Sequence, residues 1–213
     1  MFVYFDLGNV LLNFDHDLMC QQMASVVQQS GASVGAEDVK AILFESRPGQ
    51  PALEWRYERG EISTEEFLDE FSQAVGAKPD ASHLAKAASE IFTANVSVRA
   101  VLGALLATRQ PLGLLSNTNA VHWEYIAQRK DMLIPSAFRV LALSFELGCM
   151  KPEAEIFAKA AELAGVAPQE IFYVDDIAGH VSAARAAGFH AVQYTSTPQL
   201  VDDLRACGIA LNY

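Results

Sequence analysis

The sequence predicts an α/β fold: a parallel, doubly wound sheet with a helical subdomain inserted after its first strand. Three observations predict it. Short runs of the chain are continuously apolar, helical apolar patterns separate these runs, and one connection between runs is far too long to be a single helix. Continuous apolar runs are typical of strands buried on both faces, as the strands of parallel sheets are.

The expected strands cover residues 2–5, 112–115, 140–143 and 171–174, with a weaker fifth at 191–194. Between them, apolar residues recur with the spacing of one helix face at Val98, Val101, Leu102, Leu105 and Leu106, and again at Ile156, Phe157, Ala160, Leu163 and Ala164. Strands that alternate with helices form right-handed crossovers, which build a parallel sheet with helices on both sides.

The first connection carries the insertion. Phe5 and Leu112 lie more than three times as far apart as the roughly 30 residues that a βαβ unit needs. The inserted segment reads as helical: a helix is expected over 52–59, ended by Gly60, and Ser63 with Glu66 matches a capping box before the apolar stripe of Phe67, Leu68, Phe71 and Val75. We therefore expect a Rossmann-like core over 1–14 and 93–213, and a helical cap over 15–92.

Composition excludes several classes of protein. The 213 residues are 51% hydrophobic and 19% charged, which is typical of a globular chain, and the net charge of −11 without a basic run argues against nucleic acid and anionic membranes as partners. The three cysteines have no metal or disulfide spacing, and no apolar stretch reaches the roughly 18 residues of a membrane span. We expect a cytoplasmic protein, either monomer or homodimer.

Polar residues fall where the expected strands end. The first strand ends at Asp6, the second at Ser116 and Asn117, and the fourth at Asp175 and Asp176, while a loop after the third carries Lys151 and Pro152. Each of these alone is compatible with a turn or a helix cap. Because ligands bind beyond the carboxyl ends of parallel strands, their joint occurrence favours a functional site.

This set of side chains supports phosphoryl transfer. A carboxylate can attack phosphorus and form an aspartyl-phosphate, which divides one difficult displacement into two easier ones. Mg²⁺, held by one or two carboxylates, would bring the two anions together, and Lys151 would neutralise further charge. Ser116 and the amide of Asn117 would donate to the phosphoryl oxygens.

The motifs resemble those of the haloacid dehalogenase superfamily, in particular members with a helical cap after the first motif. The matching stretches are Phe5–Leu11, Leu115–Thr118, Met150–Pro152 and Val174–Ile177. Their order and spacing agree over essentially the whole chain. The segment Arg59–Ser63 also resembles the cap of the subgroup that contains bacterial α-D-glucose-1-phosphate phosphatase and the phosphatase domain of soluble epoxide hydrolase.

The resemblance implies a role for each matching residue. Asp6 would be the nucleophile and a magnesium ligand, with the Gly8 carbonyl and Asp176 as further ligands. Asp175 would orient the metal's water or Lys151.

Substrate would be held by Ser116 and Asn117, and Lys151 would stabilise both the phosphate and the nucleophile. One departure matters: most phosphatases of the superfamily have a second aspartate two positions after the nucleophile, where this chain has Gly8. That aspartate protonates the leaving group, and such assistance is worth roughly 10²- to 10⁴-fold. A cap residue, water or an undemanding leaving group could replace it.

Further residues leave two interpretations open. His180 follows Asp176 by four positions, so it is either structural or acts on the metal site through water. Asp15 and His16 either begin a helix, which we favour, or face the cleft. Substrate specificity residues are sought in the cap among Arg47, Trp55, Arg56, Tyr57 and Arg59.

The leading hypothesis is a Mg²⁺-dependent phosphatase of a small phosphorylated metabolite, for example a sugar phosphate. One alternative is a dehalogenase-type enzyme in which Asp6 attacks carbon. Asp175 and Asp176 argue against it, since a metal-free displacement has no use for two extra carboxylates. A second alternative is a non-catalytic module that binds a phosphorylated ligand.

Overall fold

A five-stranded parallel sheet forms the centre of the core. The computed structural model describes residues 1–132 and 135–211. The sheet has the strand order β5-β4-β1-β6-β7. Its strands are β1 (Phe2–Phe5), β4 (Leu112–Ser116), β5 (Val140–Leu143), β6 (Ile171–Asp175) and β7 (His190–Gln193). Every pair of neighbours is parallel, so the predicted fold class is confirmed, with β7 one residue earlier than expected.

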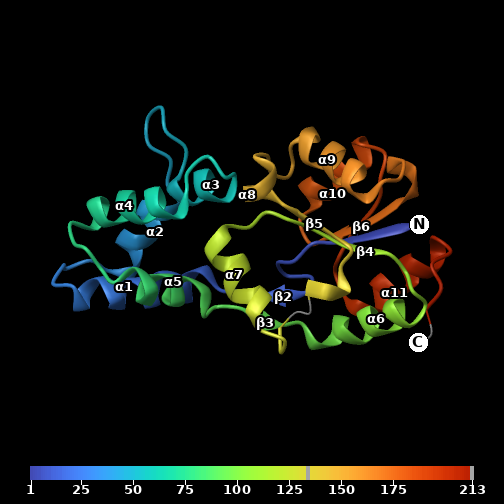
Figure 1. The fold of residues 1–213 in the computed structure, drawn as a ribbon, viewed down its shortest axis with the longest axis horizontal. Coiled ribbons are helices and arrows are strands. Elements are labelled where there is room, and N and C mark those ends of the chain that lie inside the picture. The colour runs from blue at the N-terminus through green and yellow to red at the C-terminus, as the bar shows by residue number, and fades with distance from the viewer. Residues whose placement is uncertain (133–134, 212–213) are drawn as a thin grey trace.

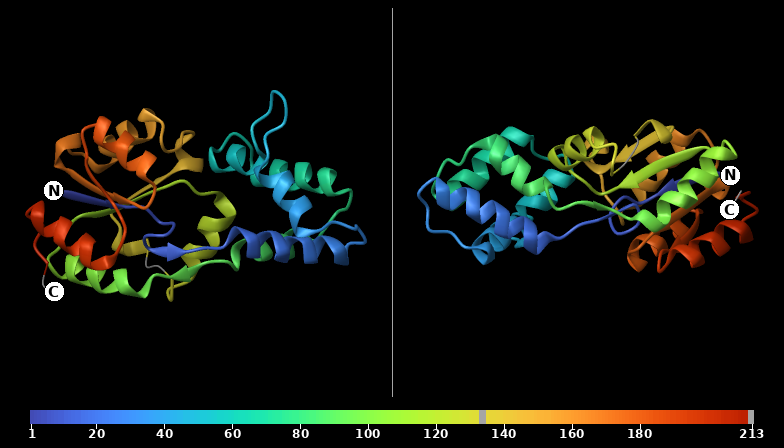
Figure 2. Two further views of the ribbon diagram at one scale, coloured as in Figure 1. Left: turned by 180° about the vertical axis from the view of Figure 1, so that it is seen from behind. Right: turned by 90° about the horizontal axis from the view of Figure 1, so that it is seen from below.

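Helices cover both faces of this sheet. In Figure 1, α9 and α10 lie on one side and α6 and α11 on the other, and the view from behind in Figure 2 gives the same grouping. The helices and short 3₁₀ turns of the core are α6 (Val96–Ala107), α7 (Ala120–Gln128), η1 (Pro135–Ala137), α8 (Ser144–Leu147), α9 (Ala154–Ala164), η2 (Pro168–Glu170), α10 (Ala178–Ala186) and α11 (Thr197–Ala206).

The sheet strands are buried on both faces because their side chains alternate between two apolar clusters. Val3 and Phe5 pack with α6 and α11, whereas Phe2 and Tyr4 pack with α9 and α10. The apolar pattern of α6 was wrong at one position, since Leu106 is 43% exposed. The buried face of α6 is centred nearer Val101, so Leu106 falls at its edge.

The insertion is helical, as predicted. It contains α1 (His16–Gln29), α2 (Ala36–Phe44), α3 (Leu53–Glu58), α4 (Thr64–Val75) and α5 (Ala81–Ser89). A short antiparallel pair, β2 (Leu12–Asn13) with β3 (Thr93–Ala94), joins the two ends of the insertion to the core. We call residues 15–92 the cap; these exact boundaries stay a prediction.

The cap has its own apolar cluster, to which α7 of the core adds Ala120 and Val121. The predicted capping box begins α4: Ser63 accepts from the Glu66 amide, and the Glu66 carboxylate accepts from the Ser63 amide. Figures 1 and 2 show the cap at one end of an elongated molecule, beside α7 and α8.

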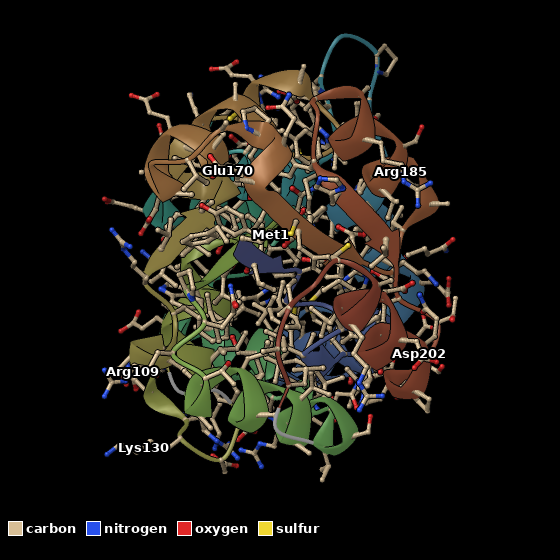
Figure 3. The ribbon with its side chains drawn as sticks, turned by 90° about the vertical axis from the view of Figure 1, so that its right-hand side faces the viewer. Met1, Arg109, Lys130, Glu170, Arg185 and Asp202 are labelled. Carbon is tan, nitrogen blue, oxygen red and sulfur yellow. The ribbon has the colours of Figure 1, made fainter. Side chains whose placement is uncertain are left out.

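The opposite end of the core is polar and mixed in charge. Figure 3 looks onto this end, with Met1 near the middle and the side chains of Arg109, Lys130, Arg185 and Asp202 spread around the periphery. Among the described residues, no helix has both the length and the apolar character needed to cross a membrane.

Candidate active site

Four segments that are distant in sequence bring polar side chains to the carboxyl edge of the sheet. Asp6 follows β1, Ser116 ends β4, Asp175 ends β6, and Lys151 comes from the loop between α8 and α9. The three strands are neighbours in the order β4-β1-β6, so their ends meet. A cavity of about 380 Å³ lies at this edge. The predicted site residues that line it are Asp6, Gly8, Ser116, Asn117, Lys151 and Asp176.

Lys151 is the charged centre of the site. Its buried Nζ lies 2.8 Å from Asp6 Oδ1 and 2.7 Å from Asp175 Oδ2, and it donates to the Tyr173 hydroxyl at 3.0 Å. Burial alone would lower the pKa of Lys151, but the two carboxylates outweigh burial and raise this pKa above its usual value. Lys151 therefore stays protonated and links two acidic strand ends.

Asp175 is fully buried beneath the cavity and is saturated with hydrogen bonds. It accepts from Lys151, from the Tyr173 hydroxyl and from the Ile177 amide at 2.8 Å. His180 Nδ1 lies 3.1 Å from its Oδ2. Burial alone would raise the pKa of Asp175, but its hydrogen bonds and the charge of Lys151 outweigh burial and hold this pKa well below its usual range. Asp175 is therefore a permanent anion that positions Lys151.

Asp6 is held differently from Asp175. Its Oδ1 accepts from the Leu7 amide at 2.7 Å and faces Lys151, while no hydrogen bond from the described residues reaches Oδ2. Burial raises the pKa of Asp6 to about 7, against the opposing charge of Lys151. One oxygen is thus fixed, and the other is available to a ligand or a reacting atom.

Residues with oxygen atoms suited to a magnesium ion line the same cavity as Asp6. Asp176 is half-buried and lines the cavity, and its Oδ2 accepts from the Asn9 side-chain amide at 3.0 Å. Carboxylate and carbonyl oxygens are the ligands that Mg²⁺ prefers, so Asp6, the Gly8 carbonyl and Asp176 fit this ion. Asp6, Asp175 and His180 also lie within 4.8 Å of one another, but the oxygens of Asp175 are already occupied by donors.

The phosphate-binding candidates lie on the other side of Asp6. Ser116 is buried at the end of β4, and its hydroxyl makes a local bond to the Asn117 carbonyl at 3.2 Å. The Asn117 side chain pairs with the Lys151 backbone in both directions, at 2.8 and 2.9 Å. This side chain therefore holds the lysine loop, which leaves the backbone amide of Asn117 as its donor toward a ligand.

The cap supplies the opposite wall of the cavity, which is largely aromatic. The residues of this cap wall are His16, Trp55, Glu58 and Phe92 of the cap, with the core residues Phe14 and His122 beside them. The Phe14 ring packs against His16 and Phe92, with centroids 4.8 and 6.2 Å apart. Burial lowers the pKa of His122 to about 4, so this imidazole is neutral at physiological pH.

The Phe14 ring packs closely over Gly8. A Cβ atom built on Gly8 would lie 2.7 Å from Cε1 of the Phe14 ring, closer than real Cβ contacts allow. An aspartate at this position would therefore force the ring to move. The core has no room for a proton donor here while Phe14 stays in place.

The structure separates the open interpretations. Asp15 caps α1 by accepting from the Leu18 amide, as favoured, but His16 lines the cavity. His180 bonds Asp175 directly. Of the five cap residues considered for specificity, only Trp55 lines this cavity.

The other four cap candidates are used elsewhere. Arg56 pairs with Glu70 at 2.7 Å, and Arg59 pairs with Glu61 at 3.1 Å. The Tyr57 hydroxyl contacts Thr64, and Arg47 lines a separate small pocket.

Sequence reasoning missed Glu58, Tyr173 and the bond from Asn9 to Asp176. Glu58 is the neighbour of the recognised segment that begins at Arg59, and Asn9 lies within the first motif. Both residues therefore lie in or beside segments that the sequence motifs indicate. Only the folded chain shows that they face the cavity or the carboxylates of the site.

Known proteins share this architecture. A family model described as haloacid dehalogenase-like hydrolase matches residues 2–188. A D-ribitol-5-phosphate phosphatase of Bacteroides thetaiotaomicron is 26% identical over 199 residues, which span 90% of each chain.

Two solved structures have the same fold. A predicted haloacid dehalogenase-like hydrolase of Porphyromonas gingivalis superposes with a TM-score of 0.79 and 23% identity, covering 96% of this chain and 97% of that one. A haloacid dehalogenase family enzyme of Bacteroides thetaiotaomicron, crystallised with magnesium and inorganic phosphate, gives a TM-score of 0.75 and 24% identity over 91% and 93% of the two chains. Because the family model matches most of its length, this chain belongs to the haloacid dehalogenase-like hydrolases.

Proposed function

We propose that the protein is a Mg²⁺-dependent phosphatase that hydrolyses a small phosphorylated metabolite through an aspartyl-phosphate on Asp6. The observation that carries this proposal is that Asp6, 2.8 Å from the Lys151 ammonium, lines one cavity with the carboxylate of Asp176, which Asn9 holds. A nucleophile with one oxygen free, a fixed cation and a metal-binding carboxylate together form the apparatus that phosphoryl transfer needs.

Asp6, the Gly8 carbonyl and Asp176 would hold the metal. When bound, Mg²⁺ would neutralise charge on the phosphoryl group, so that the anionic substrate can approach an anionic carboxylate. The pairing of Asp176 with Asn9 would keep this carboxylate turned toward the cavity.

The remaining steps fall to the chain's own side chains. An oxygen of Asp6 would attack phosphorus as the bond to the leaving oxygen breaks, and water would later release phosphate from Asp6. Lys151 would balance the negative charge that develops, while the Ser116 hydroxyl and the Asn117 amide would donate to the phosphoryl oxygens. Asp175 would hold Lys151 in place throughout.

The cap wall supports a small substrate that carries carbon and hydroxyl groups. The cavity volume of about 380 Å³ is near the lower end of typical ligand pockets. Its wall opposite the charged residues is aromatic and offers few ionic groups. The similarity to a D-ribitol-5-phosphate phosphatase supports a sugar or polyol phosphate, and the finer resemblance to glucose-1-phosphate phosphatases stays a prediction.

The test is phosphate release from a panel of sugar phosphates, polyol phosphates, nucleotides, acyl phosphates and p-nitrophenyl phosphate. Each is assayed with Mg²⁺ and again with EDTA, and Asp176→Ala is titrated with Mg²⁺ beside the unmodified protein. We expect EDTA to abolish activity, and Asp176→Ala to need at least about tenfold more Mg²⁺, since a lost ligand weakens the site.

Three results would count against the proposal or against one of its residues. Halide release from a 2-haloacid that persists in EDTA, without phosphatase activity, would indicate attack on carbon. Binding of Mg²⁺ and phosphate without turnover of any compound would indicate a non-catalytic module. An unchanged magnesium titration in Asp176→Ala would remove that residue from the metal site.

A further inference from the structure

The cavity needs a proton donor, and the core does not provide one. A displaced alkoxide is a poor leaving group unless it is protonated as it departs. Gly8 cannot supply a side chain at the position where related enzymes have an aspartate, and Phe14 fills the space. We therefore looked for a donor among the other residues of the cavity.

The described titratable residues that line the cavity are Asp6, Asp176, Glu58, Lys151, His16, His122 and His180. Asp6 and Asp176 are assigned to attack and to the metal, and Lys151 is paired with two carboxylates. His180 is bonded to Asp175. Desolvation lowers the pKa of both His16 and His122, so neither holds an extra proton at neutral pH. By elimination, Glu58 remains.

Glu58 belongs to the cap but is fixed by the core. The Ser144 hydroxyl donates to the Glu58 carbonyl at 2.6 Å. The next residue, Arg59, forms an ion pair with Glu153 of the core. Gly60 has a φ of +72° and packs so tightly on the Phe145 carbonyl that a Cβ atom would lie 2.2 Å from its oxygen. Three consecutive residues thus dock on the core beside the cavity.

The state of the Glu58 carboxyl suits proton donation. Burial, together with the smaller effects of the charges of Glu54 and Asp6, raises its pKa to about 8 against the opposing charge of Lys151. Within the described chain, no hydrogen bond engages this carboxyl group. It is therefore protonated at neutral pH and free to turn toward a bound substrate.

Building on the proposed phosphatase function, we propose that Glu58 is the general acid and base of the reaction, supplied by the cap in place of an aspartate at position 8. In the first step, Asp6 forms a bond to phosphorus, the electron pair of the broken bond goes to the leaving oxygen, and Glu58 gives that oxygen its proton. In the second step, the Glu58 carboxylate takes a proton from water as the water attacks phosphorus. The bonding pair returns to Asp6, phosphate leaves, and Glu58 is protonated again.

Glu58→Gln tests this assignment, because glutamine keeps the shape but cannot donate a proton to an alkoxide. The matched control is Glu54→Gln. Glu54 is likewise a carboxyl of α3 with a raised pKa, but it is buried, accepts from the Asn119 side chain at 2.7 Å and does not line this cavity. Both variants are assayed with Mg²⁺ on a polyol phosphate, whose alkoxide needs protonation, and on p-nitrophenyl phosphate, whose phenolate does not.

For Glu58→Gln we expect kcat/KM on the polyol phosphate to fall by about 10²- to 10⁴-fold, and kcat/KM on p-nitrophenyl phosphate to change by less than about tenfold. The ratio kcat/KM reports only the steps up to formation of the phosphorylated enzyme. Loss of the base that activates water slows the later hydrolysis step, so it lowers kcat instead. With p-nitrophenyl phosphate, the variant should release a burst of nitrophenolate equal to the enzyme concentration and then turn over slowly. Glu54→Gln should leave both substrates within about threefold.

Equal losses of kcat/KM on the two esters, in a variant with unchanged thermal stability, would show that Glu58 is structural and would overturn the inference. An undiminished rate on the polyol phosphate would overturn it as well. The proposed function has its own test: unmodified protein that releases phosphate from no compound of the panel described above would refute that function and the role of Glu58 with it. An active protein whose Glu58→Gln variant shows no dependence on the leaving group refutes only the role of Glu58.

Discussion

The two walls of the cavity differ in how their ionisable groups are charged. At the sheet edge, each charge meets a partner: Lys151 joins Asp6 to Asp175, and Asp176 accepts from Asn9. On the cap wall, the ionisable groups are neutral: His122 has lost its proton and Glu58 keeps its own. The core wall is therefore charged, whereas the cap wall is neutral and largely aromatic.

This difference separates two tasks. Fixed charges in a desolvated site stabilise the phosphoryl group and cost no reorganisation during the reaction. An aromatic and neutral wall selects the leaving group and can hold a proton at neutral pH. We expect substitutions in the charged wall to lower activity on every substrate. The effect of substitutions in the cap wall should instead depend on the leaving group of the substrate.

The largest effect is expected at Asp6. Asp6→Asn keeps the shape and can still accept from Lys151, but it removes the nucleophile, so we expect kcat to fall by roughly 10⁴-fold or more on every substrate. The matched control is Asp202→Asn on α11, an exposed position at the far end of the molecule that should retain full activity (Figure 3). Substantial turnover by Asp6→Asn would refute the nucleophile assignment. Lys151 is less informative, because its removal would leave two buried carboxylates unpaired.

A second prediction concerns the pH dependence of stability. It concerns Glu54, a buried carboxyl of the cap that has no cationic partner among the described residues, unlike the carboxylates that Lys151 pairs in the core. Burial raises the pKa of Glu54 to about 7 from its ordinary 4.5. Since the folded state holds this proton more tightly, the stability that Glu54 contributes is complete below about pH 4.5 and is lost as pH rises through 7. The loss is on the order of 3 kcal/mol.

We expect the free energy of unfolding of the unmodified protein to fall relative to Glu54→Gln between pH 5 and pH 8, measured in denaturant titrations. The comparison rests on the slope with pH, because the new amide of glutamine adds a cost that is independent of pH. Parallel curves for the two proteins would show that Glu54 titrates normally.

The smallest expected effect comes from moving the proton donor from the cap to the core. Gly8→Asp in the Glu58→Gln background should give no recovery, because the Phe14 ring blocks the new side chain. Adding Phe14→Ala opens the space, and we expect about tenfold recovery of kcat/KM on a polyol phosphate, relative to Glu58→Gln with Phe14→Ala alone. Full recovery without the change at Phe14 would show that the ring does not exclude an acid.

The edge of the sheet was predictable from sequence to a large extent. Strand runs such as Phe2–Phe5 and Ile171–Val174 are apolar without interruption, so their ends, and therefore Asp6 and Asp175, could be located. The capping box at Ser63 fixed the start of α4 for a similar local reason. The roles of these residues in catalysis stay predictions.

The cap wall was less predictable. Among the cap residues considered for specificity, Arg56 and Arg59 turned out to be tied up in ion pairs, and only Trp55 lines the cavity. Charge and position in a helix do not indicate which way a side chain faces when the helix packs on several partners. Glu58 was overlooked for the same reason.

The sequence by itself determined the order of the strands' apolar runs, the length of the insertion and the identity of the polar residues at the strand ends. These features depend on hydrophobic pattern and spacing, which are local properties of the chain. Only the tertiary structure decided that Phe14 occupies the space beside Gly8, that His180 bonds Asp175 and that Glu58 reaches the cavity. Such contacts depend on how segments distant in sequence pack together, and that packing sets both the free space around a side chain and the pKa of a buried carboxyl.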